Sequence, residues 1–455
     1  MVRSYLVLAL RNFLRNKNYT LINLLGLSIG ITSCLILFLV IRYDLNFDKF
    51  HTKYESIYRI VQESSSSSGT EFSSATPYPV IKGVRNDFPR IPLTTQVHFE
   101  GEGIIRIDES KFKIEDLLFA DSLFFDVFDF ETLSGNPRED LAEPGKAFVT
   151  PAVAQKIGYQ EHTPLRVKIN NLIEVEVVGL VQAPPATSHI QYSMIISMSS
   201  FTGDFIGGMP IDTWNLTSAG FSYVVLPESM SPETMEEQLK GFVKKYYTKN
   251  EGKERAYKLQ QLKDIHFDER FTENPTNIAN VSYSDLIVMG ILGAFILVIA
   301  CINFINLSTA LAIKKSKEIG IRKTLGAKRS QLTVYFLGET FLLTLLSVLI
   351  SLGLVEWILP WLNQFLEKRI SLDLFGDPML MLFILAMVLC TTVLSGFYPA
   401  LILSGFNPVA VLKNKITAHG STSAEVRKSA CRIPVYDRAV FDHRYTSDCR
   451  PDGIF

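Results

Sequence analysis

Residues 21–41 read LINLLGLSIGITSCLILFLVI, and this uncharged apolar stretch decides the class of fold. A helix that crosses the hydrocarbon core of a bilayer needs about 20 consecutive, mostly apolar residues. Three more stretches of this kind occur, at about 286–308, 333–356 and 379–404. Buried helices of soluble proteins seldom stay so apolar for so long. The sequence therefore predicts an integral membrane α-helical protein with four transmembrane helices.

Lysine and arginine near the span ends predict the orientation, because basic loops tend to stay in the cytoplasm. Residues 1–20 and the loop 309–332 are both strongly basic, whereas the turn between the third and fourth spans mixes both signs. The N-terminus, the 309–332 loop and the C-terminal tail are therefore expected to be cytoplasmic. The loop carries Lys314, Lys315, Lys317, Arg322, Lys323, Lys328 and Arg329 against one acid, Glu318.

The N-terminal region is predicted to be an uncleaved anchor rather than a signal peptide. RYDLNFDKFH follows the first span, where a cleavage site would need small residues. Residues 1–20 are expected to form a cytoplasmic amphipathic helix on the membrane surface, and residues 21–43 the first transmembrane helix. Trp357 and Trp361 lie where the outer interface is expected, as interfacial aromatic anchors do.

Residues 44–283 are predicted to form one large extracytoplasmic domain of mixed α+β structure. Alternating or β-branched stretches predict strands at 57–61, 147–150, 167–170, 174–181 and 223–226. Helices are expected at 76–87, 151–157 and 232–246. The serine run 64–68 followed by Gly69 is interpreted as a flexible loop.

This domain shows no recognisable catalytic or metal-binding pattern. Residues 44–283 contain no cysteine, and His51, His98, His162, His189 and His266 are scattered, so they are interpreted as surface or satisfied core histidines. Neither a GxSxG motif nor a GxxxxGK[ST] phosphate loop occurs. The acidic segment ADSLFFDVFDFETL lacks calcium-loop spacing, and its carboxylates are expected to flank buried Phe124, Phe125, Phe128 and Phe130. The net charge of −1 argues against a general nucleic-acid binder.

The loop after the second span reads KKSKEIGIRKTLGAKRSQL at 314–332 and is more organised than a simple basic loop. Ile319, Leu325 and Leu332 supply apolar positions, while Gly320 and Gly326 permit close approach. We interpret it as a short helix parallel to the membrane that docks on a partner protein. The competing interpretation is ordinary helix formation combined with positive-inside charge.

Several of these segments resemble the permease family of ABC transporters typified by the FtsX and MacB proteins, which includes the lipoprotein-releasing permeases. The specific segments are CINFINLSTA at 301–310, KEIGIRKTLGA at 317–327, FLGETFLLTLLS at 336–347 and SGFYPALILSGFNPVAVLK at 395–413. NFLRNKNYTLINLLGLSIGI at 12–31, DSLFFDVFDFETLSGNP at 121–137 and VVGLVQAPPATSHI at 177–190 are also similar to the family. The resemblance covers about residues 1–415.

The resemblance implies a MacB-like periplasmic core domain at 44–283 and an FtsX-like domain at 284–415. It further implies a non-enzymatic permease subunit in a bacterial inner membrane that binds no cofactor, forms a homodimer or pairs with a second permease, and contacts a cytoplasmic ABC ATPase and a periplasmic adaptor. The ATPase would be a separate polypeptide that drives motion of the periplasmic domain, a mode called mechanotransmission. The coupling role is carried onto Glu318, Ile319, Gly320, Ile321, Arg322, Lys323, Gly326 and Ala327.

Two functions are compatible with this resemblance. One is export of a peptide or a lipophilic compound. The other is a regulatory or sensory membrane protein that controls a periplasmic partner, such as a cell-wall hydrolase, without moving a substrate. Translocation of a compound distinguishes the two.

Two further features have alternative interpretations. Glu339, inside the third span, is either a functional intramembrane acid or a group that faces the inner interface or the coupling segment and is satisfied locally. The tail 416–455 holds no apolar run, and we expect it to be disordered, as a frameshifted or prematurely ended part of a longer duplicated permease. A genuine cytoplasmic tail is the alternative, and an intact reading frame in the coding sequence would support it.

Overall fold

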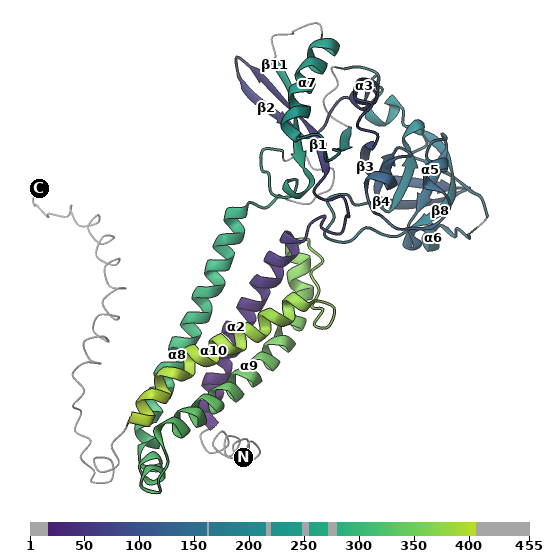
Figure 1. Ribbon diagram of the computed structural model, residues 1–455. Coiled ribbons are helices and arrows are strands. Elements are labelled where there is room, and N and C mark those ends of the chain that lie inside the picture. The colour runs from purple at the N-terminus through teal and green to yellow at the C-terminus, as the bar shows by residue number, and fades with distance from the viewer. Residues whose placement is uncertain (1–16, 162, 215–219, 248–253, 272–279, 406–455) are drawn as a thin grey trace, which may run out of the picture. The chain divides into compact units, whose positions relative to one another are not determined.

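The computed structural model describes residues 17–161, 163–214, 220–247, 254–271 and 280–405, without the side chains of 312–318 and 403 (Figure 1). The chain divides into two compact units, and each is described by itself. Among the described residues, the first contains 17–27, 300–348 and 381–405. The second contains Ser28–Ile299 and Leu349–Leu380.

Four helices in the described part of the chain are long and apolar enough to cross a membrane, which confirms the four predicted spans. They are α2 (Lys17–Leu45), α8 (Tyr283–Thr324), α9 (Arg329–Leu366) and α10 (Pro378–Gly405). At 1.5 Å per residue, α8 is about 63 Å long, roughly twice the thickness of a hydrocarbon core. This helix therefore continues well beyond the membrane. The expected amphipathic helix at 1–20 and the tail 416–455 fall wholly or largely outside the described residues.

The domain between α2 and α8 contains one mixed sheet with the strand order β11-β1-β10-β3-β4-β9-β6-β8-β5, from which β2 and β7 branch. β4 pairs in parallel with β9, and β6 in parallel with β8, whereas the other pairs are antiparallel. The strands are β1 (Ile57–Ser66), β2 (Gly69–Ser73), β3 (Thr94–Ile107), β4 (Ser110–Ala120), β5 (Thr132–Ser134), β6 (Lys146–Val149), β7 (Leu165–Ile169), β8 (Ile173–Val181), β9 (Met194–Ser197), β10 (Phe221–Val225) and β11 (Glu254–Gln261).

Each strand predicted in this domain overlaps an observed strand, namely β1, β6, β7, β8 or β10. The domain helices are α3 (Pro79–Asp87), α4 (Phe124–Val127), α5 (Pro137–Asp140), α6 (Pro151–Ile157) and α7 (Pro232–Tyr246), with short 3-10 turns at 198–200, 203–206 and 262–264. α6 and α7 have the predicted bounds because a proline occupies the first turn of each helix. α3 starts later than expected, at Pro79, since Thr76 pairs as a bridge with Gly220.

The prediction of a flexible loop over the serine run was wrong for Ser64–Ser66, which belong to β1, whereas Ser67 and Ser68 form the turn into β2. Ser64 and Ser65 pair with β2 on one side and β11 on the other, and Ser66 pairs with β2. Gly69, with φ of 132°, allows the tight return into β2. Partner strands on both sides supply backbone hydrogen bonds that compensate for the low strand propensity of serine.

The core of the domain lies on both faces of this sheet. β8 shows the alternation expected of a strand, because Val175, Val177 and Val181 are buried between more exposed neighbours. Phe124, Phe128 and Phe130 are buried in one cluster and Phe125 is partly buried against it, as the acidic segment predicted. The mixed α+β domain is therefore confirmed, with its apolar residues distributed as the strand period requires.

Candidate functional site

The segment predicted to couple to an ATPase forms a helical hairpin, defined here as residues 319–336 and called the α8–α9 hairpin. α8 continues unbroken to Thr324, and α9 starts at Arg329, so the prediction of a short separate helix parallel to the membrane was wrong. Lysine, glutamate, alanine and isoleucine tolerate a helix well, and the single interior Gly320 is too weak a breaker to end it.

The turn of the hairpin closes through a Schellman motif. Gly326 has a φ of 93°, its N–H donates to the carbonyl of Lys323 at 3.0 Å, and the N–H of Ala327 donates to the carbonyl of Arg322 at 3.0 Å. At the start of α9, the side-chain oxygen of Gln331 accepts the N–H of Lys328 at 3.0 Å. Backbone groups at the end of α8 and the start of α9 thus have hydrogen-bond partners within the turn, which makes the turn well defined.

One side of the hairpin is buried within its own unit. Ile319, Leu332 and Phe336 pack together with Ala400 of α10, and Ala327 packs against this cluster. The guanidinium carbon of Arg322 lies 4.7 Å from the ring centroid of Tyr335, an arrangement that favours a cation–π interaction. The Nε of Arg329 donates to the hydroxyl of Ser404 at 3.3 Å. These contacts join α8, α9 and α10 near the turn.

The other side of the hairpin is exposed and carries apolar side chains among polar and basic ones. Ile321 is 52% exposed and Leu325 is 82% exposed, and they lie one helical turn apart. Val334 of α9 is also exposed. Exposed apolar side chains on a segment rimmed by basic residues are typical of a surface that contacts another protein.

The predicted coupling residues therefore divide into two groups. Ile319 and Gly320 are buried, whereas Ile321 and the turn residue Gly326 are exposed. Arg322 and Lys323 are intermediate, as is Ala327. The side chain of Glu318 lies outside the described residues.

A second polar cluster lies in the other unit, where the membrane helices meet the domain. We call it the outer junction and define it as Arg42, Asp44, His266, Lys368 and Asp377. The Nζ of Lys368 lies 2.6 and 2.7 Å from the two oxygens of Asp44, and Nε2 of His266 lies 3.1 Å from the same carboxylate. Asp44 is completely buried, so this carboxylate depends on these two partners for the interactions that water would otherwise provide.

Aromatic rings surround this buried carboxylate. Phe47 stacks on the imidazole of His266 with the ring centroids 3.6 Å apart, and the Nζ of Lys368 lies 5.4 Å from the centroid of the Tyr43 ring. Nearby, Arg42 forms a bidentate pair with Asp377 at 2.5 and 2.7 Å. Burial alone would raise the pKa of Asp377, but the hydrogen bond and charge of Arg42, together with the backbone N–H groups of Leu380 and Met379, lower that pKa below its ordinary value.

The outer junction connects residues at or beside the ends of α2, α9 and α10 with the segment that leads into α8. Asp44 lies near the end of α2, Lys368 follows α9, and Asp377 immediately precedes α10. His266 lies in the segment that connects β11 with α8, and its carbonyl accepts the N–H of Val281 at 3.0 Å, directly before α8. The junction therefore joins the base of the domain to the outer ends of the helices within one compact unit.

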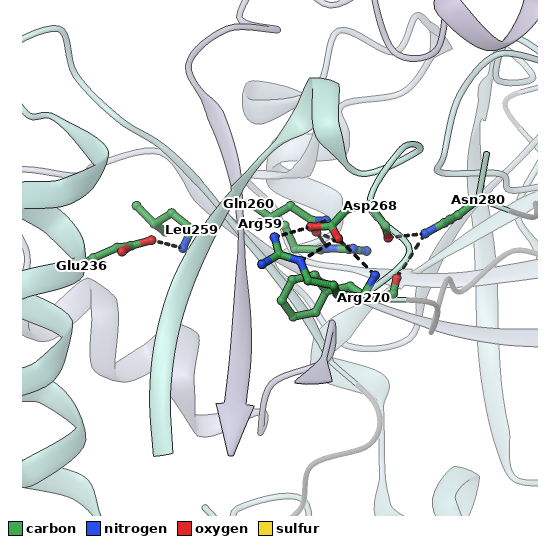
Figure 2. Close-up of polar contacts among 8 residues, drawn as sticks. Arg59, Glu236, Leu259, Gln260, Asp268, Arg270 and Asn280 are labelled. Atoms are coloured by element: carbon green, nitrogen blue, oxygen red, sulfur yellow. Dashed lines mark hydrogen bonds and ion pairs between the residues drawn. The ribbon is translucent and has the colours of Figure 1, made fainter. Parts of the chain in front are cut away.

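A polar chain continues from the connecting segment into the sheet, as Figure 2 shows. Arg270 pairs with Asp268 at 2.9 Å, and Asp268 accepts from the side chain of Gln260 at 3.3 Å. Gln260 in turn accepts two hydrogen bonds from Arg59, at 2.6 and 3.0 Å. Arg59 is fully buried, and burial lowers its pKa. Asn280 donates to the carbonyl of Asp268 at 2.7 Å, so the chain anchors the connecting segment on the sheet.

Another buried chain starts just after α2. Asp48, in the left-handed region at a φ of 58°, lies 2.9 Å from Nδ1 of His189, and Nε2 of His189 lies 2.9 Å from the hydroxyl of Tyr223. Burial raises the pKa of Tyr223, against the opposing effect of Arg59. Although this order of acid, histidine and hydroxyl resembles a catalytic relay, all three side chains are buried and cannot reach a substrate. We interpret the chain as structural.

His51 and His98 are buried core residues, although the buried Nε2 of His51 has no hydrogen-bond partner among the described residues. His51 is buried, and its Nδ1 accepts the N–H of Asp129 at 3.0 Å, while burial lowers its pKa to about 4. His98 is also buried and contacts the hydroxyl of Tyr78 at 2.8 Å. His162 lies outside the described residues. Within the described part of the chain, no group of histidine, cysteine and acidic residues could hold a metal ion.

Glu339 is buried in the first unit beside a small cavity of about 30 Å³. Tyr19 and Ser308 also line this cavity, and their hydroxyl oxygens lie 2.6 Å apart. A cavity of this size holds one or two waters by volume. The surroundings of Glu339 are thus locally polar, as one of the two sequence interpretations required, and the other interpretation, a functional role, stays a prediction.

Sequence reasoning missed the outer junction. Asp44, His266 and Lys368 are far apart in the chain, and each one alone resembles an ordinary polar residue. The available signal was the charge of Asp44 directly after the first predicted span, where a partner is needed if the domain packs over it.

Comparison with known proteins agrees with this architecture. Residues 20–242 match the MacB-like periplasmic core domain, and residues 290–408 match the FtsX-like permease C-terminal domain. An uncharacterized ABC transporter permease of Bacillus subtilis (strain 168), YknZ, is 29% identical over 105 residues, which cover 23% of this chain and 24% of that protein. The chain therefore matches about a quarter of the length of this relative.

Two solved extracytoplasmic domains are also similar. The extracellular domain of YknZ has a TM-score of 0.30 and 14% identity, covering 41% of this chain and 89% of that structure. The periplasmic region of MacB from Actinobacillus actinomycetemcomitans has a TM-score of 0.33 and 14% identity, covering 47% of this chain and 91% of that structure.

Four helices able to span a membrane, with a large mixed domain inserted between the first and second, define a polytopic membrane protein. The two matched domains identify it further as a permease. The chain belongs to the FtsX/MacB family of ABC transporter permeases.

Proposed function

We propose that the chain is the permease subunit of a mechanotransmission-type ABC transporter. A separate cytoplasmic ATPase docks on the α8–α9 hairpin, and its motion passes along the helices to the extracytoplasmic domain. The single observation that carries the proposal is the exposed apolar pair Ile321 and Leu325 beside a turn that is well defined by hydrogen bonds. An apolar surface at a fixed hairpin tip suits a protein partner.

Transmission of force requires that the outer ends of the helices move together with the domain. The buried pair of Asp44 with Lys368 and the bidentate pair of Arg42 with Asp377 supply such connections. Breaking a buried charge pair is strongly unfavourable. Motion of the helix ends would therefore move the domain as well, because the charge pairs between them would stay intact. This arrangement favours domain motion over a simple pore.

The proposal includes a bacterial inner membrane as location, with the N-terminus and the hairpin in the cytoplasm. It also includes a homodimer or a second permease as membrane partner, a periplasmic adaptor, and a peptide or lipophilic compound as cargo. The second candidate function is regulation of a periplasmic partner such as a cell-wall hydrolase, and the size of the domain is compatible with it. ATP-dependent uptake of a peptide or dye by proteoliposomes that contain chain and ATPase would favour the first function over the second.

The docking proposal is tested by co-purification of the full chain with co-expressed ABC ATPases from the same genome. The variant Ile321→Asp plus Leu325→Asp changes exposed side chains and leaves the buried cluster around Ile319 intact. We expect loss of the complex with unchanged membrane insertion. Leu172→Asp, at an exposed position in the domain, is the matched control and should retain the complex. Retention by the hairpin variant would contradict docking at this site.

A further inference from the structure

A cavity of about 270 Å³ lies beside the outer junction, within the second unit. Leu39, Ile370 and Leu380 supply apolar lining, and Arg42, Arg369, Asp373 and Asp377 supply charged lining. Leu39 belongs to the apolar part of α2, while Asp377 immediately precedes α10. The cavity therefore lies at the level where the spans leave the hydrocarbon core, with apolar and charged walls in one space.

The charges of this cavity leave one cation and one anion available. Arg42 and Asp377 neutralise each other in a bidentate pair. Within the described residues, Arg369 and Asp373 belong to no close ion pair, although the charge of Arg369 favours the ionised form of Asp116 and Asp373 accepts the N–H of Gly376 at 2.8 Å. Both side chains are exposed rather than buried. A ligand that carries one negative and one positive group would complement these two positions.

The volume limits what can bind. Pockets for whole drug-sized ligands measure about 300–1,000 Å³, so 270 Å³ fits a headgroup more readily than a complete amphiphile. The acyl part of an amphiphile would stay outside the cavity, in the bilayer next to the apolar α2 and α10. Arginine is the side chain best suited to phosphate, because its planar guanidinium binds two oxygens at once.

We propose that this cavity binds the zwitterionic headgroup of a phospholipid from the leaflet next to the domain. Arg369 binds the phosphate, Asp373 binds the ammonium group, and the acyl chains lie against the apolar surface near Leu39 and Leu380. The inference goes beyond the proposed function and does not depend on an ATPase partner. It assigns a lipid site at the position where the domain and membrane helices are joined.

The test uses the purified full chain in nanodiscs made from equal parts phosphatidylethanolamine and phosphatidylglycerol. After transfer to detergent and stepwise delipidation, native mass spectrometry counts the lipids that remain bound. We expect wild type to retain phosphatidylethanolamine in preference to phosphatidylglycerol. Arg369→Ala and Asp373→Asn should each reduce that retention about tenfold, since each removes one charge-assisted contact.

Arg90→Ala and Glu228→Gln alter exposed charges of the domain outside the cavity and are the matched controls, with retention expected as in wild type. Unchanged melting temperatures show that the variants fold. The proposal is overturned by equal retention of both lipids, by the same retention in the cavity variants as in wild type, or by no retained lipid in wild type. Binding of glycerophosphoethanolamine by a wild type that retains no phosphatidylethanolamine would assign the cavity to a soluble headgroup and would also overturn the proposal.

Discussion

The ammonium group of Lys368 lies 2.6 and 2.7 Å from the two carboxylate oxygens of Asp44, a side chain that is completely buried. Lys368 follows α9, the third membrane-spanning helix, and Asp44 lies near the end of α2, the first. His266, from the segment that leads into α8, contacts the same carboxylate at 3.1 Å. One buried acid thus connects three parts of the chain at the base of the domain.

We expect Lys368→Met to destabilise the protein by about 3 kcal/mol, because Asp44 would stay buried without its main counter-charge. The measurement is thermal unfolding of the purified chain in detergent. Lys240→Met removes an exposed pair with Glu237 and should change stability by less than about 0.5 kcal/mol. Adding Asp44→Asn to Lys368→Met should recover part of the loss. Equal melting temperatures for Lys368→Met and wild type would show that the pair is dispensable.

We expect His51 to make the stability of the folded domain fall at acid pH, because burial lowers the pKa of this histidine to about 4. Asp48 and Asp129 oppose this effect, and His189 and Lys53 add to it. Because an unfolded histidine has a pKa of about 6.5, the unfolded chain binds this proton first. The stabilisation is complete above pH 6.5 and is lost as the pH falls toward 4, by at most about 3 kcal/mol.

The variant His51→Asn tests this pH dependence. The asparagine oxygen can still accept the N–H of Asp129 but does not titrate. The difference in stability between wild type and variant should shrink as the pH falls from 6.5 to 4, when measured by chemical denaturation at each pH. Parallel curves for the two proteins would rule out His51 as the titrating group.

The turn of the α8–α9 hairpin should depend on Gly326, whose φ of 93° disfavours any side chain. We expect Gly326→Ala to cost about 1 kcal/mol locally and to speed hydrogen exchange of the turn amides about fivefold. Gly241→Ala is the matched control, because Gly241 lies in α7 and an added Cβ would meet open space. It should stabilise the domain by about 0.5–1 kcal/mol. Unchanged exchange at the turn in Gly326→Ala would contradict the assigned geometry.

A hydrogen bond between helices in the second unit should contribute only slightly. The hydroxyl of Ser351 in α9 donates to the carbonyl of Ser28 in α2 at 2.9 Å, and both residues are buried. Such bonds average about 0.6 kcal/mol in membrane proteins, so Ser351→Ala should lower stability by about that amount. Ser351→Leu should cost more than 1 kcal/mol, because the added volume separates the helices. Thermal unfolding of both variants in one detergent would measure the two effects, and equal losses would show that the contact is not closely packed.

Much of the architecture followed from local sequence rules. The four spans were predictable because the bilayer thickness requires a long apolar helix. α6 and α7 were predicted with their observed bounds because each starts at a proline within a pattern of helical period. The strand at Ser64–Ser66 was not predicted, because it depends on pairing with neighbouring strands. The continuation of α8 through Thr324 was not predicted either, because the apolar pattern of the span ends before the helix does.

The candidate site was predictable in position but not in detail. The sequence by itself determined that 314–332 is a basic segment between two spans, and which residues it contains. Only the tertiary structure decided that Ile319 is buried while Leu325 is exposed, because helix phase and the packing of α10 choose the covered side. The outer junction was decided entirely by the fold. A carboxylate loses its hydrating water only when segments distant in sequence pack over it. The positions of Asp44, His266 and Lys368 along the chain do not predict that packing.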